Sequence, residues 1–163
     1  RAAPIPTSCG CYAHRNKEMK EGNFICARIM ASDNKPHYYL YIVAKYANNI
    51  CEAYDPEKAD QEMNLISLKD EDWTPLPTFI PERPLKRWEF SKDTPVLSLF
   101  PELDYWTTEF YQAKVLVLPS QRQNADVRGY ELEFEGSSSR HVVPEKFIVT
   151  YSKQWQEADK DFL

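Results

Sequence analysis

The sequence predicts an all-β fold made of two small antiparallel barrels packed against each other, with short helical segments at the chain ends. Runs rich in β-branched and aromatic residues, interrupted by turn residues, are typical of short strands. Twelve prolines against four glycines, in a chain with 42% apolar residues, indicate a folded protein of many short elements. A similar scheme of strands occurs twice. Because neither copy alone would bury much core, we expect the two to pack face to face.

A proline-rich stretch at residues 75–87 lies between the two copies, and we interpret it as a stiff connection. The predicted segments are a polar leader with one helical turn at 1–20, a first unit at 21–80, a connection at 81–94, a second unit at 95–152 and a helical tail at 153–163.

In the first unit, turn residues at 33–36 and a hairpin turn at 47–49 separate the apolar runs. The expected strands are 24–29, 38–46, 50–54 and 64–68, with a closing segment at 73–77.

The second unit repeats the scheme, with expected strands at 96–100, 107–118, 130–134, 141–143 and 147–151 and a polar turn at 120–129. In each unit the third strand ends in an aromatic residue followed by an acid, which are Tyr54-Asp55 and Phe134-Glu135. Trp155, Ala158 and Phe162 then recur at helical spacing, which predicts a short terminal helix.

The charge balance favours a basic partner. The formal net charge is −5 and there is no sustained run of Lys or Arg, which argues against a surface that neutralises nucleic-acid phosphates. Carboxylates and ring faces both favour cations, and aromatic residues make up 13% of the chain. No run is long enough to span a bilayer, and the start at Arg1 leads us to expect a piece of a longer protein.

The sequence carries no pattern typical of an enzyme or a metal site. The histidines lie in polar or turn contexts without a nucleophile signature, and nothing resembles a Gly-rich phosphate loop, so we expect no catalysis and no cofactor. Cys9, Cys11 and His14 lack a second ligand pair at zinc-finger spacing, so we predict no metal. Cys26 and Cys51 fall in apolar runs, where we expect small buried side chains in a reducing compartment.

Aromatic residues gather at strand ends in the second unit. Phe100 ends one strand, Tyr111 lies near the start of the next, and Phe134 ends a third. Such positions surround the open mouth of a small antiparallel barrel, where ring faces would hold a cation. The alternation of Phe134 with Tyr130 and Leu132 fits a core position equally well, so both interpretations stay open.

Seven stretches in this order and spacing resemble the tandem Tudor family of SAGA-associated factor 29, a chromatin-complex subunit. They are Gly22 to Arg28, Tyr38 to Tyr46, the acidic turn after Glu52-Ala53-Tyr54, Pro75 to Pro77, Val96 to Pro101, Thr107 to Tyr111 and Tyr130 to Glu135. The resemblance covers residues 22–151, which is most of the chain.

The resemblance implies a nuclear module that binds the N-terminal tail of histone H3, di- or trimethylated on its fourth-position lysine, within a SAGA-like histone acetyltransferase complex. Phe100, Tyr111 and Phe134 match the family's aromatic cage. Trimethylation removes every N–H donor and keeps the charge, so ring faces gain the ligand that hydrogen-bonding sites lose, at about 0.5–2 kcal/mol per ring.

Three more residues are candidates for cage or peptide contacts. Tyr105 and Trp106 lie on a loop at 102–106 that is longer than the family's, and Thr108 follows it.

The family's acidic pair, which takes the α-amino group of the peptide, matches Asp55 and Glu57 on either side of Pro56. Two carboxylates on a stiff turn satisfy a protonated amine at about 1.5–3 kcal/mol per charged hydrogen bond. A module that binds the amine and the methylated side chain at the same time would select a methylated lysine at a fixed distance from the start of the peptide.

The chain departs from the family at several of these positions. Phe100 stands where Tyr is usual, Glu57 replaces Asp, Pro56 replaces an aliphatic residue, and acids at 70–72 replace a basic run. Two alternatives stay open, a Tudor module that prefers methylarginine and an aromatic-faced barrel that binds single-stranded nucleic acid. The acidic balance of the chain disfavours the second.

Overall fold

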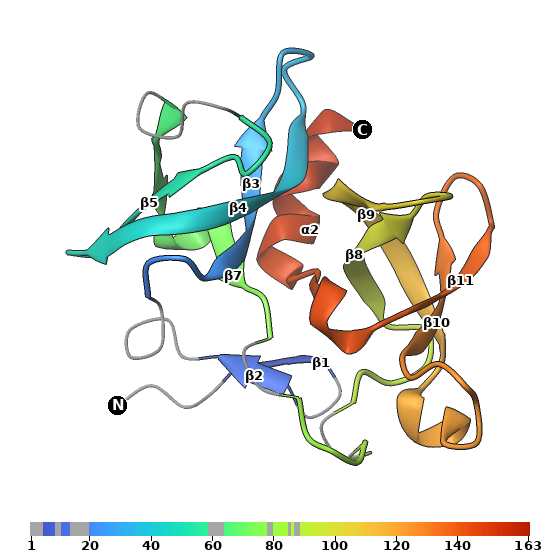
Figure 1. Ribbon diagram of the computed structural model, residues 1–163. Helices are drawn as coiled ribbons and strands as arrows, with labels where there is room; N and C mark the ends of the chain where they lie inside the picture. The colour runs from blue at the N-terminus through green and yellow to red at the C-terminus, as the bar shows by residue number, and fades with distance from the viewer. Residues whose placement is uncertain are drawn as a thin grey trace.

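The protein is described by a computed structural model that covers residues 20–58, 64–77, 80–84, 86 and 89–163, together with the backbone of residues 5–8 and 11–13. Across this part of the chain, ten strands form one antiparallel sheet that divides into two strand groups. Figure 1 shows them as two lobes with the C-terminal helix between them. The predicted all-β class is confirmed.

The first strand group has the spatial order β6-β5-β4-β3-β7. A short 3-10 helix, η2 (Asp70–Asp72), joins its two outer strands. Asn48 and Asn49, both with positive φ, close the predicted hairpin between β4 and β5, a conformation that asparagine tolerates better than most residues. The strands are β3 (Phe24–Met30), β4 (Pro36–Ala47), β5 (Ile50–Tyr54), β6 (Ile66–Lys69) and β7 (Trp73–Pro75).

The second strand group has the same order, β11-β10-β9-β8-β12, and the same kind of connection, η5 (Glu145–Phe147), between its outer strands. Another 3-10 helix, η4 (Pro119–Arg122), begins the predicted polar turn. The strands are β8 (Pro95–Pro101), β9 (Trp106–Val117), β10 (Tyr130–Phe134), β11 (Arg140–Val143) and β12 (Ile148–Thr150). The two groups are therefore two copies of one topology, as the repeated strand scheme indicated.

The groups join differently from the expected face-to-face packing. Strand β4 pairs with β9, Tyr38 opposite Phe110 and Tyr39 opposite Glu109, so the sheet runs on from one group into the other. A shared core lies beside this seam and includes Tyr38, Leu97, Phe110 and Trp155, all nearly inaccessible to solvent. Each group also has its own apolar core, so ring and aliphatic burial stabilises both the groups and their junction.

The C-terminal helix α2 (Lys153–Asp159) confirms the helical spacing seen in the sequence. Ser152 caps it, because its side-chain oxygen accepts a hydrogen bond from the Trp155 N–H at 3.1 Å. The helix continues into the 3-10 turn η6 (Lys160–Phe162). Within the described residues, no helix combines the length and apolar character that crossing a membrane requires.

The predicted leader contains two strands that the sequence analysis did not expect. Strand β1 (Ile5–Ser8) pairs with β2 (Cys11–Ala13) as a separate two-stranded sheet. The helical turn expected in the leader falls on residues 14–19, outside the described part of the chain.

Candidate functional site

The three predicted cage residues line one pocket in the second strand group. Phe100 comes from the end of β8, Tyr111 from the middle of β9 and Phe134 from the end of β10. The ring centroid of Phe100 lies 6.4 Å from that of Tyr111 and 4.9 Å from that of Phe134, with interplanar angles of 85° and 77°. Both pairs are edge-to-face contacts, and the three rings line a common space. The pocket measures about 220 Å³, and its lining is Phe100, Glu102, Tyr111, Phe134, Glu135 and Ser137.

Two of the rings in the pocket differ in solvent exposure. Phe134 is 2% exposed and belongs to the core of the second group, whereas Tyr111 is 42% exposed. The Phe134 ring is therefore part of the core and also lines the pocket. A cation entering this space would meet the buried Phe134 ring and the accessible Tyr111 ring.

Local hydrogen bonds hold Phe100 where the β8–β9 ladder is irregular. The register shifts between Leu99 and Pro101, so the backbone of Phe100 lacks a regular ladder partner. Its N–H donates instead to the Thr107 hydroxyl oxygen at 2.9 Å, and that hydroxyl donates to the Glu109 carbonyl at 2.8 Å. The extra residues of this bulge lie on β9, so β9 bends opposite Phe100.

Carboxylates give the pocket a negative rim. Glu102 and Glu135 both line it, next to three rings whose faces are also electron-rich. Burial raises the pKa of the Tyr111 hydroxyl, and the charges of Glu109 and Glu102 raise it further. The same charges that disfavour a tyrosinate would favour a cation at this position.

Sequence reasoning missed four residues at this pocket. Glu102, Glu135 and Ser137 line it, and the His141 ring packs 4.9 Å from Phe100 and 5.9 Å from Phe134. The alternation of β10 and the hairpin register of β11 could have placed His141 beside Phe134, since His141 pairs with Leu132 two residues away.

The other three candidates do not line the pocket. The Trp106 ring lies 4.9 Å from the Phe147 ring and packs against both the core of the second group and the shared core. Tyr105 is 66% exposed on the loop between β8 and β9. Thr108 is half-buried and alternates onto the face of β9 opposite to Tyr111. Tyr105 and Thr108 stay candidates only for contacts outside the cage.

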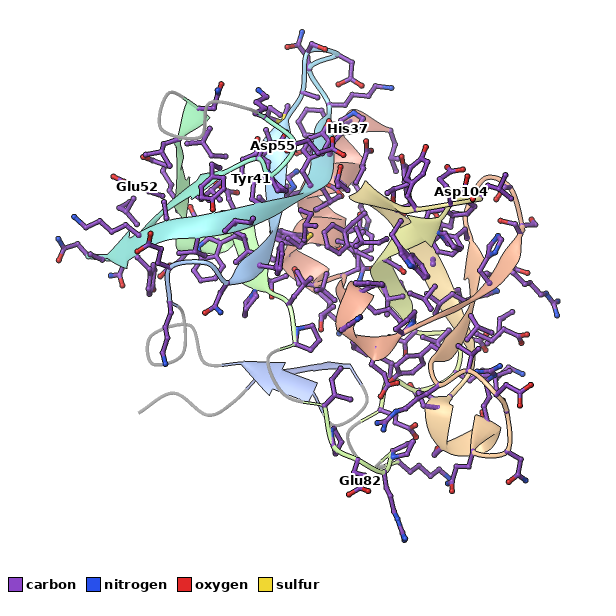
Figure 2. The ribbon with its side chains drawn as sticks, viewed as in Figure 1. His37, Tyr41, Glu52, Asp55, Glu82 and Asp104 are labelled. Atoms are coloured by element: carbon purple, nitrogen blue, oxygen red, sulfur yellow. The ribbon has the colours of Figure 1, made fainter. Side chains whose placement is uncertain are left out.

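The predicted amine-binding acids lie at the end of β5 in the first group. Asp55 folds the turn, because its Oδ1 accepts a hydrogen bond from the Glu57 N–H at 2.9 Å. Asp55 is partly exposed and Glu57 is exposed. Burial first, and then the charge of Asp55, raise the pKa of Tyr41. Figure 2 shows Asp55, Tyr41 and His37 on the same side of the first group.

A continuous surface connects this turn with the pocket across the seam. Asp55 continues β5 opposite Tyr41, Tyr39 pairs with Glu109, and Tyr111 lies two residues farther along β9. Strands β5 and β9 both pair with the edge of β4 opposite to β3, so the separation is four residue steps along the sheet. With about 3.3 Å per residue, Asp55 and Tyr111 lie roughly 13 Å apart between Cα atoms. Three extended peptide residues span about 10 Å, and a lysine side chain adds its own length. A chain end at Asp55 could thus present its fourth side chain to the pocket.

The residues around Tyr41 and Tyr111 differ between the two copies. Tyr41 and Tyr111 are both the sixth residue of a twelve-residue strand. On the neighbouring strand, Ala53 pairs with the residue two after Tyr41, and Phe134 pairs with the residue two after Tyr111. Ala53 thus has the place beside Tyr41 that Phe134 has beside Tyr111. The third strands end at Tyr54 and Phe134, each followed by an acid, as the sequence predicted.

The same register places Ala27 at the position of Phe100, because each lies two residues after the partner of its tyrosine. Ala27 and Ala53 are inaccessible to solvent, and Tyr41 is 9% exposed over them. The first group therefore has one ring where the second has three.

No metal site is formed by the described residues, among which no group of three or more His, Cys, Asp or Glu is suited to hold an ion. Cys9 and His14 lie outside that part of the chain. Cys26 and Cys51 are buried, as expected, and burial raises the pKa of the Cys26 thiol well above its usual value.

Comparison with known protein families gives a match to the SGF29 tudor-like domain over residues 11–152. The chain belongs to this family. It is therefore a Tudor-type module of the chromatin-reader kind, and such reader domains are typically non-catalytic. A comparison with curated proteins found no match. The match to the SGF29 tudor-like family spans both strand groups and ends before helix α2.

Proposed function

We propose that this SGF29-type Tudor module reads the N-terminal tail of histone H3 carrying a di- or trimethylated lysine at the fourth position. It would do so in the nucleus, as part of a SAGA-like histone acetyltransferase complex. The observation that carries the proposal is the convergence of Phe100, Tyr111 and Phe134 on one acid-rimmed pocket, connected by an acidic and aromatic surface to the turn at Asp55.

Each part of the surface has a distinct task. The methylammonium group has no N–H donor left when trimethylated, so its attraction comes from the three ring faces and the negative rim of the pocket. The α-ammonium group has three N–H donors, which would donate hydrogen bonds to the carboxylates of Asp55 and Glu57. Because one rigid surface carries both, the second contact forms at a high effective concentration once the first is made.

Acids on the path between the two sites favour a basic peptide. His37 lies there with its Nδ1 3.1 Å from Glu109 Oε2 and its Nε2 2.8 Å from Asp33 Oδ2. Its ring stacks on that of Tyr39 at 6.0 Å. The tail of a histone is rich in Lys and Arg, so this acidic path would steer the peptide toward the pocket.

A calorimetric titration with four synthetic H3 tail peptides tests the proposal. The peptides are unmodified or trimethylated at the fourth-position lysine, each with a free or an acetylated α-amino group. We expect the free trimethylated peptide to bind at least about tenfold more tightly than either the free unmodified or the acetylated trimethylated peptide. Equal affinities for the trimethylated and unmodified peptides would contradict the cage. A tenfold preference for methylarginine peptides would assign the pocket to a different ligand.

A further inference from the structure

Asp159 is a buried carboxylate at which helix α2 and both strand groups meet. Tyr38 and Tyr151 both donate their hydroxyl protons to its Oδ2, Tyr151 at 2.5 Å. Arg28 donates to its Oδ1 from Nε at 3.1 Å and from Nη2 at 2.8 Å. Arg28 and Tyr38 belong to strands β3 and β4 of the first group, and Tyr151 directly follows β12 of the second. One side chain thus connects three parts of the fold.

The seam between the groups lies at this carboxylate. Tyr38 is also the residue through which β4 pairs with β9, opposite Phe110. The Trp155 ring of α2 packs 5.1 Å from the Tyr38 ring, and its Nε1 donates to the Glu71 carbonyl at 2.7 Å. Figure 1 shows α2 lying between the two lobes. The helix is therefore held to the first group by Arg28, Tyr38 and Glu71.

The hydrogen bonds to the Asp159 carboxylate are of a strong and directional type. Hydrogen bonds to an ionised carboxylate are shorter and stronger than neutral ones, and a pair of N–H groups from one guanidinium adds directional specificity. Burial first, and then the bond to Asp159, raise the pKa of both tyrosine hydroxyls above their usual value, so both stay proton donors. Loss of the carboxylate would leave the Arg28 charge at the seam without its partner.

We propose that Asp159 is a positioning residue that sets the orientation of the two strand groups and so couples the amine site at Asp55 to the cage at Tyr111. This inference rests on the proposed function, in which one peptide occupies both sites. Two sites joined through a loose seam would lose the effective concentration that a fixed separation provides. Helix α2, which lies beyond the family match, then contributes to peptide binding through Asp159.

The test compares Asp159→Asn with Glu157→Gln, which removes the same charge from the same helix. Glu157 is exposed and pairs with Lys160 only across one helical turn. Each variant is titrated with the trimethylated H3 peptide, with a free and with an acetylated α-amino group. In the wild type, the free peptide should bind at least about tenfold more tightly than the acetylated one. In Asp159→Asn the ratio of the affinity for the free peptide to that for the acetylated peptide should fall below about threefold, with unchanged affinity for the acetylated peptide. Glu157→Gln should keep the wild-type ratio.

A folded Asp159→Asn variant that keeps the wild-type ratio would overturn the proposal, and so would equal weakening of both peptides, which signals general damage to the fold. Where Asp159→Asn fails to fold, Tyr151→Phe removes one hydroxyl donor and should give an intermediate ratio. An unchanged ratio in Tyr151→Phe would equally overturn the proposal.

A measurement without peptide separates this inference from the proposed function. Residual dipolar couplings of the free protein report the relative orientation of the two strand groups. We expect a different or averaged orientation in Asp159→Asn and Tyr151→Phe and the wild-type orientation in Glu157→Gln. The same orientation in all four proteins would overturn the positioning role, even where the wild type distinguishes the peptides. If the wild type does not distinguish the two peptides, the proposed function fails while the orientation still tests Asp159.

Discussion

The two strand groups have the same strand order and differ in the residues around Tyr41 and Tyr111, each the sixth residue of its long strand. The second group has an open, ring-lined pocket there, and the first has a closed core. The residues concerned are Phe100, Tyr111 and Phe134 in the second group and Ala27, Tyr41 and Ala53 in the first. The topology alone therefore does not make a cage. The side chains at three register positions decide whether this fold presents ring faces or buries them.

The contrast extends to the segment that follows the third strand. After Ala53 the first group continues into the acidic turn at Asp55, whereas after Phe134 the second group turns sharply through Gly136, with a φ of 87°, into β11. Positive φ favours glycine here.

The largest expected effect comes from making the second group like the first. Phe134→Ala removes a ring that is 2% exposed and should cost about 3–5 kcal/mol of unfolding free energy, as large-to-small core changes do. Chemical denaturation of the variant and the wild type gives the difference. A loss below about 1 kcal/mol would mean that Phe134 lines the pocket without supporting the core.

Tyr111→Ala should separate binding from stability. Because Tyr111 is 42% exposed, the variant should stay folded, yet its affinity for the trimethylated peptide should fall about 30-fold, or about 2 kcal/mol. Tyr41→Ala in the first group is the matched change. It removes a nearly buried ring, so it should lower stability while the preference for trimethylated over unmodified peptide persists in the folded protein. Equal loss of preference in both variants would place the cage elsewhere.

The strands were predictable because turn residues and apolar runs are local signals. Phe100 and Phe134 lie at strand ends, as predicted, because strand ends of a small barrel converge, whereas Tyr111 reaches the same pocket from the middle of β9. The bulge that shifts β4 between Val43 and Lys45 was not predictable, because it inserts one residue without a mark in the sequence. Long-range partners, such as Tyr38 and Asp159, 121 residues apart, carry no local signal at all.

Asp55→Asn should weaken binding of the free trimethylated peptide about tenfold, near the lower end of the range for a charge-assisted hydrogen bond, since Asp55 is partly exposed. The same variant should bind the acetylated peptide as the wild type does. Glu52→Gln, on the same strand, is a suitable control. Calorimetry with both peptides provides the measurement, and equal weakening of the two would remove Asp55 from the amine site.

The smallest expected effect concerns the contact between the groups at His37. Its hydrogen bonds to Glu109 and then Asp33 raise the pKa of His37 above the ordinary value. The stabilisation of the folded protein by these His37 contacts is therefore fully present below about pH 6.5. It is lost as the pH rises through the folded-state pKa of His37. At pH 5.5 the melting temperature of the wild type should exceed that of His37→Gln by about 2–4 °C at most. This difference in melting temperature should be smaller at pH 8.5. A gap that widens with pH would contradict this role.

The most direct test of the account observes which rings surround the ligand. An H3 peptide with a free α-amino group and ¹³C-labelled trimethyllysine methyl groups is bound to the protein, and intermolecular nuclear Overhauser effects are recorded from those methyls. The account predicts contacts with the rings of Phe100 and Tyr111 in the second strand group and none with Tyr41 in the first. Contacts with Tyr41, or none with Tyr111 in a saturated complex, would contradict it.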